Sequence, residues 1–221
     1  MSASLLGLDK SDILLDVVAS YSPWFSMAER IYGCEGYALD LRRFQPGIHG
    51  KLIGADATAM PLPDGFATKM TLHSAYEQFE GTVDIRFLSE ARRILRDNGK
   101  MSILPLWIDN SYYVLLATYR DASTVDRDGA AIVWDDYRWP IKFERFYSVE
   151  AFNERVIANL RGFSATVYYV ENAKEIASWI DWPNYYLKFS VLFEKSPAAD
   201  DDQGKNPQPL EHDSGFNFVG A

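Results

Sequence analysis

The sequence predicts an α/β fold built around a mostly parallel sheet. Residues 13–18 (ILLDVV) form a short apolar run, and residues 24–33 (WFSMAERIYG) carry apolar side chains at helical spacing. Ser22 and Pro23 stand between them, as an N-cap and a first helical residue do. Because this alternation of strand and helix continues along the chain, we expect parallel strands joined by right-handed crossovers.

The remaining elements follow the same order. Further strands are predicted at residues 36–41, 51–57, 66–74, 100–108, 162–172 and 184–195, and further helices at residues 82–95 and 148–162. Asn98-Gly99 is expected to end the helix of residues 82–95 as a left-handed cap. The last two strands follow one another directly, which indicates an antiparallel edge. The predicted fold is therefore a Rossmann-like, seven-stranded, mostly parallel sheet with an antiparallel edge strand and helices on both faces.

Length and composition indicate one globular domain with a tail. The chain has 221 residues, of which 48% are hydrophobic and 24% charged. We expect one domain over residues 1–195, in which the aromatic and irregular stretch of residues 107–147 forms a lid or insertion. Residues 196–221 are rich in Asp, Gly, Pro and Asn and lack periodicity, so a disordered acidic tail is expected there.

Charge and cysteine content limit the classes of partner. The net charge of -9 argues against a nucleic-acid partner, because such binding depends on clustered Lys and Arg. No segment approaches the roughly 20 apolar residues of a membrane span. With the single cysteine Cys34 and no basic leader at the start, a cytoplasmic location is expected. The acidic run of residues 200–202 lacks companion ligands, so no metal site is predicted.

Three aspartates lie toward the ends of the first three predicted strands. Asp16, Asp40 and Asp56 all map to the carboxyl ends, where an open parallel sheet binds its ligands. A carboxylate after the second strand can accept hydrogen bonds from ribose hydroxyls, and one after the third can accept from an adenine amine. The positions therefore suit a nucleoside ligand.

Two longer motifs carry a resemblance to a known family. The stretch GADATAMPLPDGFATKMTLHSAYEQFEG (54–81), followed by FLSEARRILRDNGKMSILPL (87–106), resembles class I S-adenosylmethionine-dependent methyltransferases. With the preceding elements, the similarity spans roughly residues 12–108. It implies S-adenosylmethionine as the cofactor, and it implies cofactor-binding roles for Asp16, Ala19, Ser20, Tyr21, Ser22, Asp40, Leu41, Asp56, Ala57, His73 and Ser74.

The sequence departs from that family in the cofactor loop. The usual pattern Asp-x-Gly-x-Gly-x-Gly is replaced by residues 16–22 (DVVASYS), which contain no glycine. Glycine there allows a tight turn and a close approach to the ligand, so Val18 in the first glycine position narrows the space. Gln78 also stands where many relatives carry a histidine, which removes one proton acceptor.

Candidate catalytic residues follow the fourth strand: His73, Tyr76 and Glu77. His73 is a general base or a hydrogen-bonded core histidine, and Tyr76 and Glu77 line an acceptor site or begin a helix as ordinary first-turn residues. The local readings also remain for the acids, with Asp40 as a capping residue and Asp56 in an Asx-turn. Three roles are open for the aromatic residues of 107–147: they stack against an acceptor, they pack a lid, or they form a subunit contact in a homo-oligomer.

Two functions follow from these patterns. The first is methyl transfer from S-adenosylmethionine to a small-molecule acceptor, with catalysis mainly by alignment and desolvation. The alternative is a catalytically inactive, methyltransferase-like binding or assembly protein, which the missing glycines favour. An NAD-linked dehydrogenase is disfavoured, because it needs a glycine-rich first turn.

Overall fold

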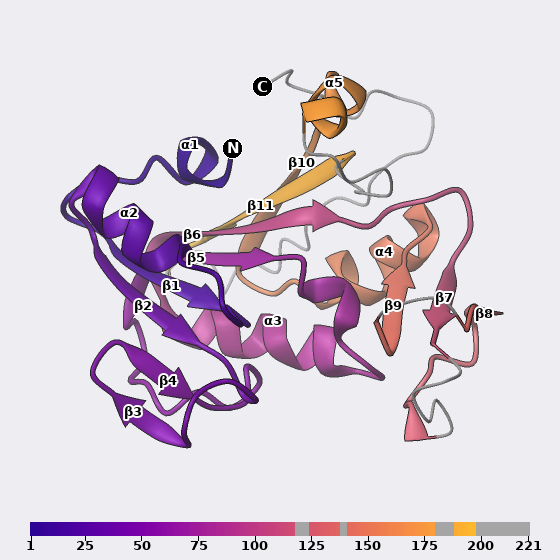
Figure 1. Ribbon diagram of the computed structural model, residues 1–221, viewed down its shortest axis with the longest axis horizontal. Coiled ribbons are helices and arrows are strands. Elements are labelled where there is room, and N and C mark those ends of the chain that lie inside the picture. The colour runs from indigo at the N-terminus through magenta and orange to yellow at the C-terminus, as the bar shows by residue number, and fades with distance from the viewer. Residues whose placement is uncertain (118–123, 138–140, 180–187, 198–221) are drawn as a thin grey trace.

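The computed structural model describes residues 1–117, 124–137, 141–179 and 188–197 (Figure 1). Within them, the main sheet has eight strands in the order β10-β11-β6-β5-β1-β2-β4-β3. Its strands are β1 (Ile13–Val17), β2 (Glu35–Leu39), β3 (Gly47–His49), β4 (Leu52–Gly54), β5 (Ala67–His73), β6 (Leu95–Leu106), β10 (Phe163–Tyr169) and β11 (Phe189–Lys195).

The central five strands are parallel. β4, β2, β1, β5 and β6 pair in parallel, whereas β11 runs antiparallel to both β6 and β10. The Rossmann-like class and the mostly parallel sheet are confirmed. The antiparallel strand lies one place in from the edge, because the later strand β11 inserts between β6 and β10. The eighth strand, β3, pairs antiparallel with β4 in a hairpin that the sequence pattern does not reveal.

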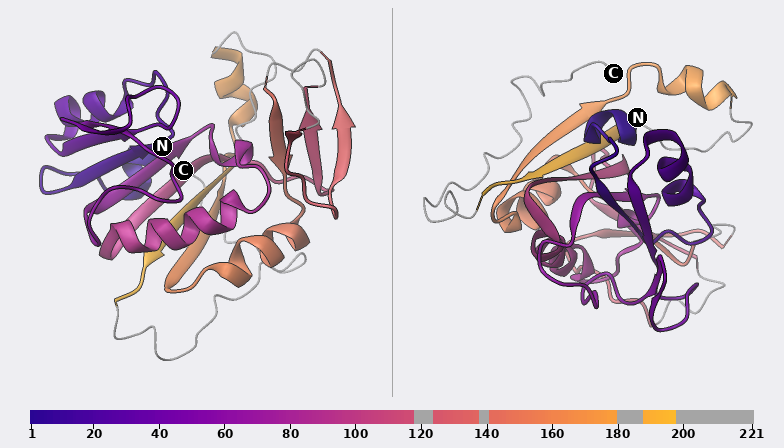
Figure 2. Two further views of the ribbon diagram at one scale, coloured as in Figure 1. Left: turned by 90° about the horizontal axis from the view of Figure 1, so that it is seen from below. Right: turned by 90° about the vertical axis from the view of Figure 1, so that its left-hand side faces the viewer.

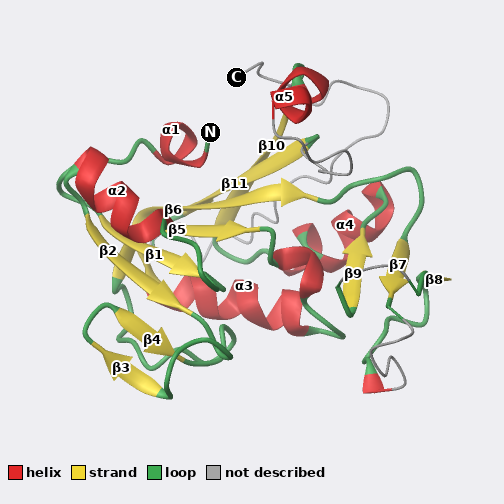
Figure 3. Ribbon diagram, viewed as in Figure 1, coloured by secondary structure: helices red, strands yellow, loops and turns green. Residues whose placement is uncertain are grey.

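Helices cover both faces of this sheet, as predicted. In Figures 1 and 3, α1, α2 and α5 lie on one side of it and α3 and α4 on the other. Their bounds are α1 (Ser2–Leu6), α2 (Trp24–Tyr32), α3 (Val83–Ile94), α4 (Val149–Arg155) and α5 (Ala173–Trp179), with short 3-10 helices η1 (Tyr76–Gln78) and η4 (Ile157–Asn159). None of these described helices combines the length and hydrophobicity needed to cross a bilayer.

One cap prediction is wrong. The helix α3 ends at Ile94, and Leu95 already has the extended conformation in which β6 begins. Asn98 does adopt a left-handed φ of 62°, but it lies inside the irregular start of β6, where the register with β5 shifts. The sheet pairing of Leu95 with Ala67 therefore ends the helix before the Asn-Gly pair is reached.

The aromatic stretch of residues 107–147 contains a second, three-stranded sheet in the order β8-β7-β9. Its strands are β7 (Tyr113–Leu116), β8 (Ile132–Asp135) and β9 (Phe143–Phe146). Figure 2 shows this small sheet at one side of the molecule, away from α2. Its β9 edge contacts η1, which follows β5, so it stands beside the carboxyl end of the main sheet.

Two apolar clusters hold the main sheet to its helices. The larger lies on the α3 and α4 face and includes the fully buried Phe87 and Phe152. The smaller lies under α1 and α2 and includes Leu6, Leu14 and the buried free thiol Cys34. Three places lie outside the described residues: the start of the predicted strand at 184–187, parts of the 107–147 stretch, and most of the expected disordered tail.

Candidate functional site

The loop between β1 and α2 turns as a glycine-containing loop does, without any glycine. Val18 has a φ of 57° and Ser20 a φ of 51°, both in the left-handed region. Non-glycine residues rarely adopt this region, because the Cβ atom crowds the following carbonyl group. The Ala19 N–H donates to the Leu39 carbonyl at 3.0 Å, and this bond ties the loop to the end of β2.

Asp40 holds this loop and the next one together. Its Oδ2 accepts from the Ser20 N–H at 2.9 Å, and its Oδ1 accepts from the N–H groups of Arg42 and Arg43 at 2.8 and 2.9 Å. Asp40 therefore holds the turn that follows β2, although no helix begins there. A carboxylate offers about four acceptor positions, so one remains on Oδ2 for a ligand. Leu41, next to it, is 60% exposed.

Tyr21 and Ser22 complete the loop. The Arg43 guanidinium lies 4.3 Å from the centre of the Tyr21 ring, and its Nη1 donates to the Tyr21 hydroxyl at 2.9 Å. Tyr21 is exposed, so this contact bridges the two loops on their outer side. Ser22 Oγ accepts from the Trp24 N–H at 3.2 Å, which supports the start of α2 one residue later than predicted.

A polar cluster joins β1, β5 and α1 beneath the loop. Asp16 is buried, and its Oδ1 accepts from the Thr71 hydroxyl at 2.8 Å. The same oxygen lies 3.7 Å from His73 Nδ1, while His73 Nε2 lies 2.9 Å from the Ser2 hydroxyl of α1. His73 is therefore a hydrogen-bonded histidine that α1 covers from above.

Two buried polar atoms of this cluster have no hydrogen-bond partner within the described part of the chain. One is Asp16 Oδ2, an acceptor, and the other is Trp24 Nε1, a donor. The Trp24 ring meets the His73 ring edge to face at 5.6 Å between centroids, so both atoms flank His73. Since an unpaired buried polar atom costs roughly 1–3 kcal/mol, the pair marks a place that a ligand can satisfy.

Asp56 lies further out, past the end of β4. It is exposed, and its Oδ1 accepts from both the N–H and the hydroxyl of Thr58 at 2.8 and 2.9 Å, which is an Asx-turn. The neighbouring Ala57 is buried. The local reading of Asp56 is thus observed, and its carboxylate stands at the rim of the loops.

The residues after β5 turn inward. Ser74 has a left-handed φ of 50°, and its N–H donates to the Leu104 carbonyl at 3.0 Å. Tyr76 and Glu77 begin the short helix η1, as the first-turn reading expects, and they are only 1% and 2% exposed. Burial, reinforced by the nearby Glu144, raises the pKa of Glu77 to about 8. Gln78 donates from its side chain to the Ser74 carbonyl at 2.8 Å and so closes the turn.

The fold therefore brings Asp16, His73 and the loop at 18–22 together, with Asp40 tied to the same loop. Sequence reasoning missed Ser2, Trp24 and Thr71. Thr71 had a local signal, because it lies two residues before His73 and so shares its face of β5. Ser2 and Trp24 lie on α1 and α2, and only the packing of these helices on the sheet places them at His73.

Comparisons with known proteins agree with this geometry at the level of fold. No family profile and no curated protein sequence matches the chain. Among solved structures, one similar to it is the 1,6-didemethyltoxoflavin-N1-methyltransferase of Burkholderia thailandensis with bound S-adenosylhomocysteine, with a TM-score of 0.57 and 12% identity over 89% of this chain and 75% of that one.

Two other similar structures match nearly the same share of this chain. The (4+2)-cyclase SpnF has a TM-score of 0.55 and 17% identity, over 89% of this chain and 79% of the cyclase. A protein of Galdieria sulphuraria that is described as a sarcosine dimethylglycine methyltransferase has a TM-score of 0.54 and 15% identity, over 87% of this chain and 81% of the other. The chain thus has the class I S-adenosylmethionine-dependent methyltransferase fold.

Proposed function

We propose that this protein binds S-adenosylmethionine and transfers its methyl group to a small-molecule acceptor. The observation that carries the proposal is the pair of buried atoms without partners beside His73, Asp16 Oδ2 and Trp24 Nε1. One accepts and the other donates a hydrogen bond. The amino-acid end of S-adenosylmethionine offers the complementary groups, an ammonium and a carboxylate.

The remaining cofactor contacts follow from the loops. The free acceptor position of Asp40 suits a ribose hydroxyl, and Leu41 with Ala57 suits the apolar faces of adenine, with Asp56 at its rim. The backbone of Ala19, Ser20, Tyr21 and Ser22 forms the turn beside these groups, and Ser74 ends the strand that carries His73. The residues present therefore fit the cofactor that the fold implies.

The chain's own residues position and shield, and the cofactor supplies an electrophilic methyl group when it is bound. Ser2 of α1 forms a hydrogen bond with His73 at this end of the site. Because the pKa of Glu77 is about 8, its carboxyl holds a proton at neutral pH and can donate a hydrogen bond to the acceptor. Tyr76 stacks on Tyr147 at 6.2 Å and forms the wall beside Glu77. Alignment accounts for most of the expected rate.

Calorimetry with S-adenosylmethionine and S-adenosylhomocysteine tests the proposal. We expect micromolar binding of both by the full chain. Asp16→Asn keeps the oxygen that faces Thr71 but replaces the free acceptor, and Trp24→Phe keeps the ring but removes the donor. Each should weaken binding about 10- to 100-fold, as expected for a hydrogen bond to a charged group. Asp97→Asn, at an exposed carboxylate that is 50% accessible, is the matched control and should bind normally.

A non-catalytic binding or assembly protein is the second candidate. Val18 packs against the main core from the first glycine position of the motif. Asp40 already accepts three hydrogen bonds from backbone N–H groups of the loops. One similar structure is a (4+2)-cyclase, so the fold does not decide in favour of methyl transfer. Absence of heat at millimolar ligand, with a folded protein, would refute the first candidate and leave the second standing.

A further inference from the structure

The small sheet has two chemically different faces. Because side chains alternate along a strand, and the pairing sets Tyr113 against both Phe146 and Ile132, the two faces can be assigned. One face carries Tyr113, Leu115, Ile132, Trp134, Glu144 and Phe146. The opposite face carries the apolar cluster of Val114, Leu116 and Phe143 together with Arg145, which pairs with Asp84. None of the six residues on the first face is basic.

Four aromatic rings form a continuous row, of which three lie on the first face and one, Trp107, precedes the small sheet. The ring centroids of Trp107 and Phe146 are 4.4 Å apart, those of Phe146 and Tyr113 also 4.4 Å, and those of Tyr113 and Trp134 6.4 Å. Phe146 is 5% exposed, whereas Trp134 is 59% exposed. The row therefore leads from the surface to the buried end of the site, near the carboxyl end of β6.

Carboxyl groups line the buried end of this row. Glu144 is 4% exposed and shares the face with Phe146. Glu77 of η1 is close enough to Glu144 for their like charges to interact, and its buried Oε2 has no hydrogen-bond partner among the described residues. Asp109, just after Trp107, accepts from the Tyr113 hydroxyl at 3.2 Å. Because a second buried carboxyl acts on Glu77, a positive charge near the two groups is favourable.

We infer that this aromatic and acidic face binds an organic cation, the protonated form of a substituted amine that is the substrate of the protein. Before methyl transfer the N–H proton passes to a carboxylate of this face, such as Glu144, so that the nitrogen lone pair is free to form the new N–C bond as the methyl–sulfur bond breaks. Aromatic faces attract such cations through the ring quadrupole, and carboxylates add direct charge attraction. A cation beside Glu77 and Glu144 also gives the unpartnered oxygen a partner and favours the ionised form of Glu77. The role as substrate rests on the proposed methyl transfer, whereas binding of the cation does not.

The test compares choline with dimethylbutanol, its neutral carbon isostere, by calorimetry on the full chain without cofactor. The two probes have the same shape, so the difference isolates the positive charge. We expect choline to bind at least tenfold more tightly. Equal affinity for the two probes, or no binding of choline by the folded protein, would overturn the inference.

Variants locate the binding. Trp134→Leu changes an exposed ring that the fold does not need, and it should weaken choline binding about three- to tenfold. Glu144→Gln removes a charge at the buried end and should weaken it at least tenfold. Glu154→Gln, at an exposed position of α4, should leave it unchanged. If Trp134→Leu and Glu144→Gln, both folded, bind choline as tightly as the original chain, the site does not lie on this face.

The same titrations with S-adenosylhomocysteine separate the two proposals. Choline binding by a chain that binds no S-adenosylhomocysteine supports the cation site and overturns its role in methyl transfer. Binding of S-adenosylhomocysteine without any binding of choline overturns the cation site and leaves the proposed methyl transfer standing.

Discussion

At the scale of single residues, the unusual feature is a left-handed loop made without glycine. An L-residue in this region costs roughly 1–2 kcal/mol, and both Val18 and Ser20 adopt it. Asp40 offsets part of this cost, because it accepts the Ser20 N–H and thereby selects the conformation. The loop keeps the shape that glycine usually allows, at the expense of stability.

Ser20→Gly should therefore stabilise the protein. Glycine adopts the φ of 51° without strain, the backbone bond to Asp40 remains, and the Ser20 side chain is exposed. We expect a gain of about 0.5–1 kcal/mol in the free energy of unfolding, measured by urea denaturation. Ser89→Gly, at an exposed position inside α3, is the control and should lose about 0.5–1 kcal/mol. A loss of stability in both variants would contradict the strain argument.

Glu77 should make stability depend on pH. Its pKa rises from about 4.5 to about 8 on folding, mainly through burial. Below the lower value both states are protonated, so the stabilisation is complete. Between the two values only the folded state keeps the proton, and stability falls with rising pH by up to about 1.4 kcal/mol per unit. The loss is complete above about pH 8.

Glu77→Gln keeps a neutral side chain at every pH and removes this dependence. The stability of the variant relative to the original chain should therefore grow from about pH 4.5 to about pH 8 and then level off. Thermal unfolding at a series of pH values measures this difference, and Glu154→Gln serves as the exposed control. A difference that stays constant over this range would show that Glu77 ionises normally.

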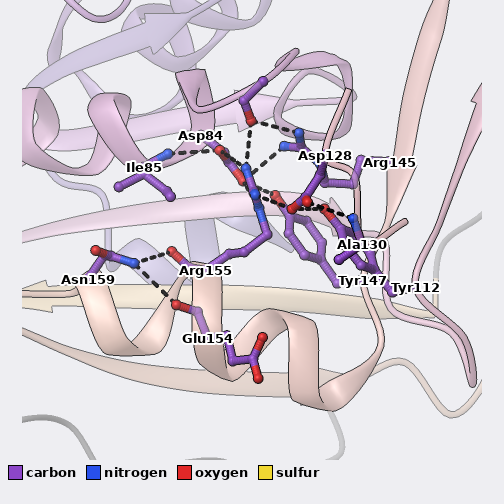
Figure 4. A network of polar contacts seen from close by, with 11 residues as sticks. Asp84, Ile85, Tyr112, Asp128, Ala130, Arg145, Tyr147, Glu154, Arg155 and Asn159 are labelled. Atoms are coloured by element: carbon purple, nitrogen blue, oxygen red, sulfur yellow. Dashed lines mark hydrogen bonds and ion pairs between the residues drawn. The ribbon is translucent and has the colours of Figure 1, made fainter. Parts of the chain in front are cut away.

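At the scale of elements, a buried ion network fixes the small sheet to the main one. Asp84 of α3 lies 2.9 Å from Arg145 Nη1 of β9 and 2.9 Å from Arg155 Nη2 of α4, and it accepts from the Tyr147 hydroxyl at 2.7 Å (Figure 4). Arg155 also pairs with Asp128, which accepts from the Tyr112 hydroxyl. Both arginines donate to the Gly81 carbonyl. The helices α3 and α4 and the aromatic segment with β9 thus meet at one carboxylate.

Asp84→Asn should destabilise the protein strongly. The substitution leaves the charge of Arg145, which is fully buried, without its nearest counter-charge. Breaking a buried pair in this way costs about 3–5 kcal/mol in the free energy of unfolding, which chemical denaturation measures. The rate of amide hydrogen exchange should increase most in β9. Asp97→Asn removes an exposed partner 3.5 Å from Lys195 and should cost about 0.2–1 kcal/mol. Similar costs for the two substitutions would rule out a structural role for the network.

At the scale of the whole molecule, ligand binding and folding are linked. The proposed cofactor contacts come from β1, α2, the loop after β2 and the end of β5, so only the folded chain offers them together. S-adenosylmethionine at about 100 times its Kd should therefore raise the free energy of unfolding by about 2.7 kcal/mol. Thermal unfolding with and without ligand measures this effect, and Asp16→Asn should reduce it at the same ligand concentration. A melting temperature unaffected by the ligand in both proteins would contradict the proposed site.

Local sequence patterns predicted much of the fold. The helical stripe of Val83, Phe87, Ala91 and Leu95 predicts α3. Phe87 and Ala91 are fully buried in the main core, whereas Leu95 already belongs to β6. The aspartates after the first strands were placed correctly at the carboxyl ends, because strand direction follows from the alternation with helices. The end of α3 was not predictable, since the pairing of Leu95 with β5 decides it.

The sequence by itself determined the α/β class, the parallel order of alternating strands and helices, and the set of acids at one edge. These follow from periodicity, which is local. Only the tertiary structure decided that Trp24 and Ser2 meet His73, that Glu77 and Glu144 are buried together, and that β7, β8 and β9 form a separate sheet. Such contacts join residues distant along the chain, and their chemistry depends on burial, which packing alone creates.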